Sequence, residues 1–365
     1  MISRILIRNK YFLHLFTLPI LLSLIGLFFI FESSSIRSFN EVGNSFYYLK
    51  LQIIWLCLGV VSMFIISNFD YHKWYYFAFF AMLVTMVLLV VVLIPGVGYK
   101  AGGARRWIDF GPVNVQPTEL AKFSVIIYLS SWFLHKERKR FYSFLALLAL
   151  LMFLIMMQPD MGTAIVVFFL SIIIYFLAGM NIINILLLLP VALIVFISLI
   201  KLSPYRFNRL LAFFDPSKDP LGISYHLNQI LVSLSNGGIF GKGFGASRQK
   251  YLFLPEAHTD SIFAIIGEEV GFVGSFLIIA LFIYLSYKMF RLVENAPDKF
   301  GKLLAGGIFA FFNLQILINL AGMVNLLPLT GIPMPFISYG GSNLLVSFVC
   351  LGILLNIEKK IAKVK

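Results

Sequence analysis

Long uninterrupted apolar runs constrain this chain more than any other feature of its sequence. They are roughly 17–25 residues long, which is the length that a helix needs to cross a bilayer. Hydrophobic residues make up 60% of the 365 residues and charged residues only 12%, more apolar surface than a soluble protein of this size can bury. A transmembrane β-barrel would alternate apolar and polar residues instead. The sequence therefore predicts an all-α integral membrane protein.

About ten such spans can be drawn, in a single polytopic membrane domain that covers residues 1–365. The largest interruption is a long polar loop at 201–258, between the seventh and eighth spans. In that loop LLAFFD and NQILVSL are apolar enough to form amphipathic elements at the membrane surface. The predicted spans are Phe12–Phe31, Leu51–Phe69, Tyr75–Ile94, Glu119–Leu134, Phe141–Met157, Gly162–Ala178, Asn181–Ile200, Thr259–Tyr287, Leu303–Leu327 and Tyr339–Ile357.

Lysine and arginine set the expected orientation. With both chain ends in the cytoplasm, the loops at 95–118 and 201–258 lie outside and hold ten of the twelve outward-facing Lys and Arg residues. Positive charge kept on the outer side needs a reason, and an anionic ligand supplies one. The net charge of +13 thus serves topology and an anionic ligand rather than nucleic acid. Cys57 and Cys350 lie inside apolar runs and suggest neither a disulfide nor a metal site.

The segment Tyr251–Gly271, YLFLPEAHTDSIFAIIGEEVG, carries ionisable residues into an apolar run. Thr259 is placed to cap the next helix, because its hydroxyl can accept from the free N–H groups of the first turn. Asp260 would then lie in that turn, where the helix dipole favours a carboxylate. Carboxylates at membrane depth are unfavourable and mark candidate functional sites. The alternative is that Asp260 only assists capping and that Glu268 and Glu269 pair with basic groups inside the bundle.

Arg105 and Arg106 lie in a glycine-rich turn before the fourth span, in the sequence GGARRW. Planar guanidinium groups donate two hydrogen bonds at once and therefore suit phosphate. Together with Trp107 these residues also fit a simpler interpretation, interfacial anchoring, because Trp and Arg both favour the lipid headgroup layer. The residues alone leave both interpretations open.

Glu119 and Lys122 stand three residues apart at the start of the fourth span and share a helix face. In lipid this pair must face the bundle interior or an aqueous cavity, and a plain ion pair is the simpler interpretation. Asp160, in QPDMGTA, stands at the start of the sixth span. Its carboxylate suits the helix dipole there, and capping alone accounts for it.

Two further loops are irregular in sequence. The loop at 201–258 holds Arg206 and Arg248 among glycines, which let backbone N–H groups approach an anion closely; a solvated loop is the alternative. It has no GxxxxGK[ST] motif, so a P-loop is excluded. Proline and glycine punctuate LLPLTGIPMPFISYGGSN before the last span, and irregular backbone at membrane depth lines a cavity or is buried in protein. Ser338 and Tyr339 would supply polar walls there.

Four of these motifs together, in this order, resemble the SEDS family of bacterial cell-wall proteins, the group that contains RodA and FtsW. The resemblance spans nearly the whole chain. SRQKYLFLPEAHTD is more similar to the FtsW branch and PLTGIPMPFISYGG to the RodA branch, so the branch stays open. Three positions depart from the common pattern, since Ser261 stands for Phe, Asn325 for Gly and Asn343 for Ser. The matching segments are GGARRWIDFGPVNVQPTELAK, QPDMGTA, DPLGISYHLNQ to FLPEAHTDSIFAIIGEEVG, and NLLPLTGIPMPFISYGGS.

The resemblance implies a peptidoglycan glycosyltransferase of the bacterial cytoplasmic membrane. Its substrate would be lipid II, a disaccharide-pentapeptide carried in membrane lipid on undecaprenyl pyrophosphate. Its partner would be a class B penicillin-binding protein, which supplies the transpeptidase. Asp260 matches the family's essential outer-face Asp, Glu119 and Lys122 match its functionally important fourth-helix pair, and Arg105 and Arg106 match its outer basic motif.

The implied reaction joins a sugar 4-hydroxyl to C1 of another sugar and expels a lipid pyrophosphate. It needs a base for the hydroxyl proton and cations for the pyrophosphate. Asp260 is expected to be the base, or to bind a divalent ion, Mg²⁺ or Mn²⁺, that activates the acceptor; no covalently bound cofactor is expected. The predicted catalytic residues are Asp260, Glu119 and Lys122, and the predicted substrate-binding residues are Arg105, Arg106, Trp107, Arg206, Arg248, His258, Ser338 and Tyr339.

Two other classes of function stay open. A lipid flippase would use the same basic, lipid-accessible cavity without chemistry and would move lipid across the bilayer without making polymer. A non-catalytic scaffold for the transpeptidase would keep its function when acidic and basic residues are replaced. An ion-coupled transporter fits less well, because the charges cluster at one face and no inverted repeat meets at mid-membrane.

Overall fold

A computed structural model describes residues 10–101, 104–109, 111, 114–134, 140–201, 204–215, 222, 224–251 and 253–364. Most of this part of the chain is helical, and one small antiparallel sheet of order β1-β2-β3 interrupts the helices. The elements are α2 (Lys10–Val42), α3 (Tyr47–Ser67), η1 (Tyr71–Lys73), α4 (Trp74–Val91), β1 (Gly98–Ala101), β2 (Ala104–Asp109), β3 (Asn114–Val115), α5 (Pro117–Trp132), α6 (Arg140–Met156), α7 (Met161–Leu177), α8 (Ile182–Lys201), α9 (Pro204–Phe214), α10 (Tyr225–Gly237), α11 (Ile262–Glu294), α12 (Lys299–Met323) and α13 (Gly341–Val364).

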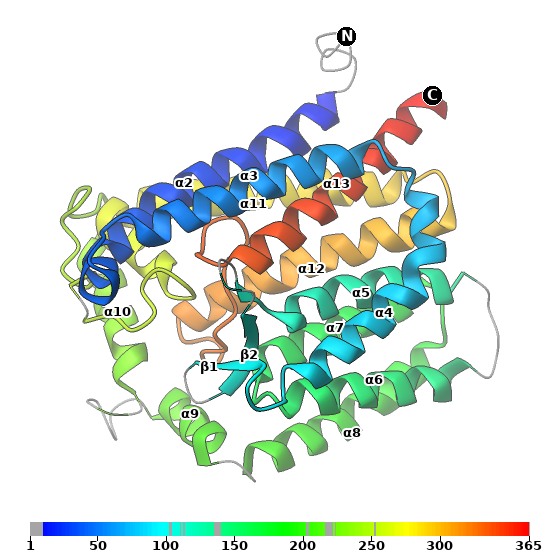
Figure 1. The fold of residues 1–365 in the computed structure, drawn as a ribbon, viewed down its shortest axis with the longest axis horizontal. Coiled ribbons are helices and arrows are strands. Elements are labelled where there is room, and N and C mark those ends of the chain that lie inside the picture. The colour runs from blue at the N-terminus through cyan, green and yellow to red at the C-terminus, as the bar shows by residue number, and fades with distance from the viewer. Residues whose placement is uncertain are drawn as a thin grey trace.

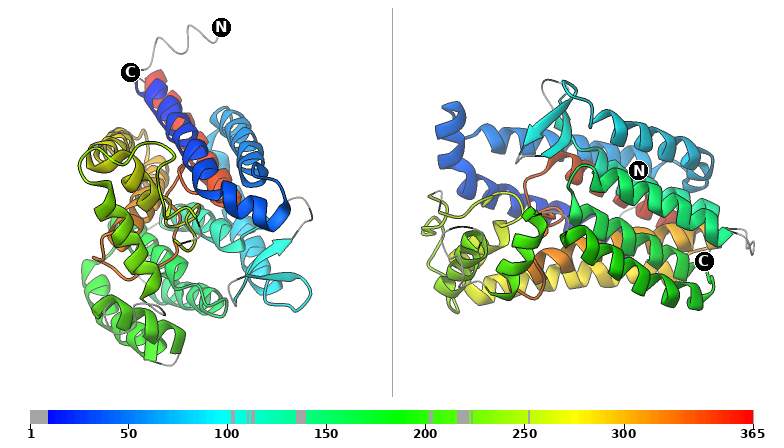
Figure 2. Two further views of the ribbon diagram at one scale, coloured as in Figure 1. Left: turned by 90° about the vertical axis from the view of Figure 1, so that its left-hand side faces the viewer. Right: turned by 90° about the horizontal axis from the view of Figure 1, so that it is seen from below.

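The long helices run back and forth between two ends of the molecule (Figure 1). One end carries the start of α2 and the end of α13. The opposite end carries the small sheet, α9 and α10, and the second view from below shows the same grouping (Figure 2). The segments that the sequence marks as polar and irregular therefore meet at one end of the bundle.

Within the described residues, six helices are long and apolar enough to cross a membrane: α2, α3, α4 with η1, α8, α11 and α12. Helices α6 and α7 are apolar but shorter. This confirms the predicted all-α membrane class, while the number of crossings stays a prediction. The share of buried residues differs strongly between these helices. In the most apolar stretch of α8 no residue is buried, whereas 72% of the residues in that of α12 are buried. Helix α12 contacts α5, α7, α11 and α13 and forms part of the centre of the bundle.

Two parts of the first third of the chain differ from the prediction. Helix α2 continues to Val42 rather than ending at Phe31; the hydroxyl of Ser33 donates to the carbonyl of Phe29, and an ion pair joins Arg37 to Glu41 one turn further on. Such bonds let a polar sequence continue a helix. The stretch at 95–118, predicted as a loop, contains the antiparallel strands β1, β2 and β3.

The long loop at 201–258 contains two helices. LLAFF lies in α9 and NQILVSL lies in α10, so the predicted amphipathic elements are confirmed as helices. Their position relative to a membrane surface stays a prediction.

The start of α11 also differs from the prediction. The helix begins at Ile262 with Ser261 as its N-cap, so Thr259 is not the cap and Asp260 does not lie in the first turn. The hydroxyl of Thr259 donates instead to the carbonyl oxygen of Glu256, at 3.1 Å. The backbone N–H groups of Thr259 and Ser261 donate to the same carbonyl, both at 3.2 Å. Hydrogen-bonded turns at residues 256–261 therefore stand where the sequence predicted the first turn of this helix.

Helix α11 is interrupted at Gly271, whose φ is +66°. The N–H groups of Phe272 and Val273, freed by the break, donate to carbonyl oxygens of the segment 238–243 at 2.9 and 3.1 Å. Two N–H groups of that segment donate back to carbonyls on the last turn before the break, each at 3.0 Å. The glycine-rich segment thus satisfies a backbone that would otherwise be left unpaired.

Two adjacent carboxylates on α11 lie beneath this segment and are almost fully buried. Glu268 lies 3.7 Å from the Nζ of Lys242, and Glu269 lies 3.5 Å from the Nζ of Lys250, which also binds Glu32 at 2.7 Å. The alternative that these two glutamates pair with basic groups is confirmed, but the basic groups are not inside the bundle. Their lysines come from the long loop, so the pairs tie that loop to the bundle.

Replacing Gly241 by alanine should destabilise this junction. A Cβ there would lie 2.1 Å from the carbonyl oxygen of Glu269, and its φ of +81° is also unfavourable for alanine. The matched control is Gly243→Ala, whose φ is +97° but whose Cβ would meet nothing within 4 Å; it should lose only the backbone term of about 1–2 kcal/mol. Thermal unfolding of both variants in detergent measures the difference, and equal melting temperatures would contradict the proposed close packing.

Candidate functional site

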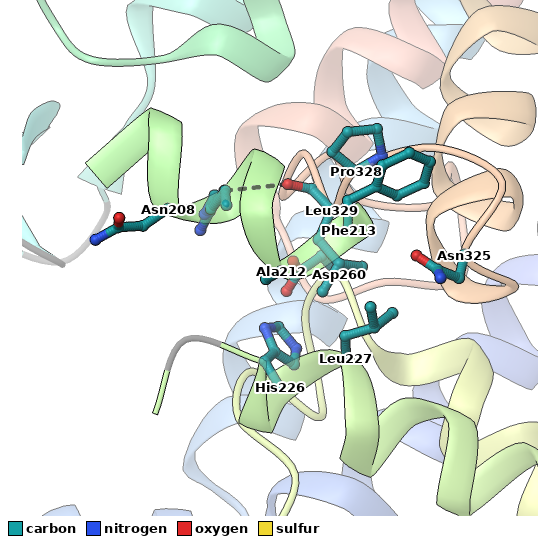
Figure 3. Close-up of a pocket in the computed structure, with 10 residues that line it drawn as sticks. Asn208, Ala212, Phe213, His226, Leu227, Asp260, Asn325, Pro328 and Leu329 are labelled. Carbon is teal, nitrogen blue, oxygen red and sulfur yellow. Dashed lines mark hydrogen bonds between the residues drawn. The ribbon is translucent and has the colours of Figure 1, made fainter. Parts of the chain in front are cut away.

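Asp260 borders a cavity of about 240 Å³ at the end of the bundle that carries α9 and α10 (Figure 3). Four segments form it: one face of α9, the start of α10, the turn before α11 that carries Asp260, and the loop that follows α12. Its walls combine polar groups with apolar side chains, as ligand sites commonly do. The described residues that line it are Asn208, Arg209, Ala212, Phe213, His226, Leu227, Asp260, Asn325, Pro328 and Leu329.

The backbone of Asp260 is held by α12. The side-chain amide of Asn319 donates to the carbonyl oxygens of Asp260 and Ile332, at 2.9 and 2.8 Å. One side chain therefore joins the turn that carries Asp260 to the loop that follows α12. The carboxylate is left facing the cavity, and its Oδ1 lies 3.1 Å from the Thr259 hydroxyl oxygen.

Two basic side chains accompany Asp260 in the cavity wall. Arg209 comes from α9 and donates to the carbonyl oxygen of Leu329 at 3.2 Å. His226 comes from α10, and its Nε2 lies 2.7 Å from the Ser261 hydroxyl. Burial raises the pKa of the Asp260 carboxyl, and His226 opposes that rise. The arrangement combines a candidate proton acceptor with a fixed cation in one hollow.

Neither Arg209 nor His226 was among the residues predicted for the site. Arg209 follows the predicted Arg206 by three residues on the same amphipathic helix, and the sequence does not say which of the two faces the cavity. The side chain of Arg206 lies outside the described residues. No pattern in the sequence singled out His226.

Glu119 and Lys122 form a second polar centre, in the interior of the bundle. The Nζ of Lys122 donates to Glu119 at 2.7 Å and to Gln315 of α12 at 3.0 Å. The side-chain amide of Asn343, at the start of α13, donates to the same two acceptors at 2.9 and 2.8 Å. All four side chains are buried, so three helices are joined by a fully paired network.

Helix α12 connects this network to Asp260. Gln315 and Asn319 stand four residues apart and so share one face of the helix; the first binds Lys122 and the second binds the Asp260 backbone. The network is nevertheless not part of the cavity, since neither Glu119 nor Lys122 is among the described residues that line it. Their predicted catalytic role stays a prediction.

The two arginines of the small sheet also lie outside the described cavity wall. The guanidinium of Arg106 donates to the carbonyl oxygens of Gln158 and Pro159, the former at 3.0 Å, and so holds the turn between α6 and α7. Arg105 and Trp107 are half-buried in β2. Substrate binding by these three residues stays a prediction.

His258, Tyr339 and Tyr48 form a cluster of three rings beside the Asp260 turn. Their centroids lie 4.8–5.5 Å apart, and the backbone N–H of Tyr339 donates to the carbonyl oxygen of His258 at 2.9 Å. Ser338 is buried next to them, where its hydroxyl accepts from the N–H of Met334. This packing fixes the loop after α12 against the Asp260 turn.

The remaining predicted residues lie elsewhere. Arg248 is exposed on the long loop and is not among the described residues of the cavity wall. Asp160 caps α7, because its Oδ1 accepts from the Thr163 N–H at 3.1 Å, which confirms the capping interpretation.

A divalent ion was expected as an alternative role for Asp260. Within the described residues, no group of three or more His, Cys, Asp and Glu side chains could hold a metal ion. Mg²⁺ often binds through one or two carboxylates together with substrate phosphates. Asp260 fits a site of that kind, in which it would be the protein ligand.

Removing Lys122 alone should destabilise the protein strongly. In Lys122→Met the Glu119 carboxylate stays buried without its cation, for which a loss of about 3–5 kcal/mol is typical. The double variant Glu119→Gln/Lys122→Met removes both charges and keeps an amide for Asn343, so its loss should be smaller. Melting in detergent, followed by tryptophan fluorescence, measures both; a double variant as unstable as the single one would contradict a stabilising role for the pair.

Comparison with known proteins identifies the family. The sequence model of the FtsW/RodA/SpoVE cell cycle proteins matches residues 12–363. Stage V sporulation protein E of Bacillus subtilis is 37% identical over 348 residues, which are 94% of this chain and 95% of that protein. A probable peptidoglycan glycosyltransferase FtsW of Trichlorobacter lovleyi is 38% identical over 356 residues, or 96% of this chain and 93% of that protein.

Solved structures share the fold. A chain of a peptidoglycan synthase complex that coordinates polymerisation and crosslinking matches with a TM-score of 0.78 and 27% identity, covering 95% of this chain and 97% of that one. The rod shape determining protein RodA of Thermus thermophilus matches with a TM-score of 0.68 and 24% identity, covering 95% and 96%. The chain is a multi-pass membrane protein and belongs to the FtsW/RodA/SpoVE family.

Proposed function

We propose that this protein is a peptidoglycan glycosyltransferase that polymerises lipid II at the outer face of the cytoplasmic membrane. Relatives that match over more than nine-tenths of the chain are named probable peptidoglycan glycosyltransferases. The observation that carries the proposal is that Asp260 and Arg209 share one cavity. A carboxylate can take the proton of the attacking hydroxyl, and a guanidinium can bind the departing pyrophosphate.

In the proposed step the 4-hydroxyl oxygen of one sugar attacks C1 of another. The new C1–O bond forms as the bond between C1 and the pyrophosphate oxygen breaks, and a single attack from the opposite face inverts C1. Asp260 takes the hydroxyl proton. The electron pair of the broken bond leaves with the pyrophosphate, whose developing charge Arg209 stabilises.

Helix α9 supports a lipid-linked substrate. Asn208, Arg209, Ala212 and Phe213 line the cavity. Their neighbours on the same helix, Phe207, Leu211 and Phe214, are 40%, 42% and 74% exposed. An apolar outer face directly beside the cavity suits a polyprenyl chain that stays in the bilayer while its pyrophosphate enters the site.

Binding a divalent cation is a second role that we propose for Asp260. Bound there together with the pyrophosphate, Mg²⁺ or Mn²⁺ would neutralise charge on the leaving group. Both roles, proton acceptor and cation ligand, require that the Asp260 carboxylate is ionised at the cavity wall.

The partner proposed is a class B penicillin-binding protein. A chain of a solved peptidoglycan synthase complex shares this fold at 27% identity. We place both chain ends in the cytoplasm and the cavity outside. In Figure 1 the start of α2 and the end of α13 lie at the end of the bundle opposite α9 and α10, which is consistent with this orientation.

Asp260→Asn should abolish polymer formation from purified lipid II, with or without the transpeptidase partner. The amide keeps the size of the side chain but cannot take the hydroxyl proton, and general base catalysis contributes about 10²–10⁴-fold. The control is Glu294→Gln, which neutralises an exposed carboxylate at the far end of α11. Near-normal polymer from Asp260→Asn would remove the base, and lipid movement without polymer in the parent protein would favour a flippase.

Arg209→Gln should lower kcat/KM for lipid II by roughly 10- to 100-fold, because a charged hydrogen bond contributes about 1.5–3 kcal/mol. Arg209→Lys should recover part of the loss, since it restores the charge without the planar fork. The same assay on Arg248→Gln tests the residue that the sequence predicted to bind substrate, for comparison with Arg209. A larger effect at Arg248 than at Arg209 would show that the pyrophosphate binds on the long loop instead.

A further inference from the structure

Glu256 has an unusual backbone conformation for a glutamate, in the turn that leads to Asp260. Its φ is +49°, in the left-handed region that favours glycine and is unfavourable for a long side chain. Its carbonyl oxygen accepts from the N–H groups of Thr259 and Ser261, both at 3.2 Å, so these two bonds bracket Asp260. Glycine would form the same turn with less strain, and the side chain of Glu256 therefore needs an explanation of its own.

The Glu256 carboxylate joins two parts of the molecule. Its Oε2 lies 3.0 Å from the Thr259 hydroxyl oxygen, which in turn lies 3.1 Å from Oδ1 of Asp260. Its Oε1 lies 3.7 Å from a guanidinium nitrogen of Arg37 on α2. The side chains of Glu256 and Arg37 are 51% and 34% exposed. An ion pair that is so exposed contributes little to stability, so it does not by itself explain a strained glutamate.

Arg37 is held in place by its own neighbours. Its Nε donates to Glu41, one turn further along α2, at 2.8 Å, and the Tyr48 hydroxyl donates to the other oxygen of that carboxylate. The ring of Tyr48 also contacts the ring of His258. The outer ends of α2 and α3 therefore contact the segment around Asp260 at two points.

We propose that Glu256 is a positioning residue, through which Arg37 of α2 sets the orientation of the Asp260 carboxylate. This inference rests on the proposed glycosyltransferase function, in which a reacting group must be held in one orientation. Asn319 fixes the backbone of Asp260, and Glu256 fixes its side chain by way of the Thr259 hydroxyl. Glu256 is not among the described residues that line the cavity, so it acts on Asp260 and not on the substrate. The alternative is that Glu256 only forms the turn, a task for which its side chain is not needed.

Glu256→Gly separates the two roles, because glycine keeps the turn and removes the carboxylate. The variant should melt at or above the parent temperature in detergent, and its kcat on lipid II should fall about three- to tenfold, the effect of losing one hydrogen bond. Binding of labelled lipid II should be unchanged when Glu256→Gly is compared in an Asp260→Asn background, where no turnover is expected. Glu256→Gln keeps a polar contact with Thr259 and should recover most of kcat.

Arg37→Met tests the link to α2 and leaves the sequence of the turn unchanged. Its kcat should also fall while KM stays the same. Amide hydrogen exchange in a peptide that covers 256–261 should be faster than in the parent, because the turn has lost its anchor. The matched control is Arg291→Met, which removes an exposed ion pair with Glu294 at the far end of α11; neither measurement should change.

Unchanged kcat in Glu256→Gly would overturn the positioning role, and so would weaker binding of lipid II, which would indicate direct contact with the substrate. A melting temperature well below that of the parent would overturn it too, because the side chain would then be needed to form the turn. Parent-like exchange in Arg37→Met would show that α2 does not hold the turn. Failure of the proposed function looks different, because the parent protein itself would then make no polymer while the exchange measurement still tests the link from Arg37.

Discussion

Charge can be buried in an apolar bundle only when each charged group is paired, and this constraint organises the polar end of the molecule. Glu119 is matched by Lys122, and Glu268 and Glu269 are matched by lysines of the long loop. Asp260 differs from these three carboxylates. Within the described part of the chain no lysine or arginine nitrogen lies within ion-pair distance of its carboxylate, which borders a cavity instead.

The paired carboxylates therefore stabilise the packing of helices and loop, whereas the carboxylate of Asp260 is available to contact a bound substrate. The Lys122 network fixes α5, α12 and α13 relative to one another. One turn further along α12, Asn319 fixes the turn that carries Asp260. A rigid interior thus positions a carboxylate at the cavity wall, which is the arrangement that a pre-organised site needs. Glu268 and Glu269, buried beneath the 238–243 segment, anchor the loop that follows α10. The first residues of α10 line the cavity beside Asp260.

The sequence predicted the features that depend on local pattern. Apolar runs located the long helices, and α6 begins and ends within one residue of its predicted span. The capping role of Asp160 also followed from its position alone. What the sequence missed depends on contacts between distant segments. The turn before α11 is held by Asn319, and the break at Gly271 is satisfied by the 238–243 segment.

The candidate site shows the same division. Asp260 was identified from a carboxylate at the edge of an apolar run. Arg209 was not, because an amphipathic helix has two faces and only the packing of α9 beside the loop after α12 decides which arginine enters the cavity. Glu119 and Lys122 were correctly placed on one helix face, yet their distance from the cavity depends on how three helices pack.

A structure of the protein in a lipid bilayer with bound lipid II, determined by electron cryo-microscopy, tests the central claim most directly. We expect the pyrophosphate to lie against Arg209, the sugar against Asp260 and the polyprenyl chain along the exposed face of α9. Lipid II bound beside Arg105 and Arg106, with no density in the Asp260 cavity, would contradict it.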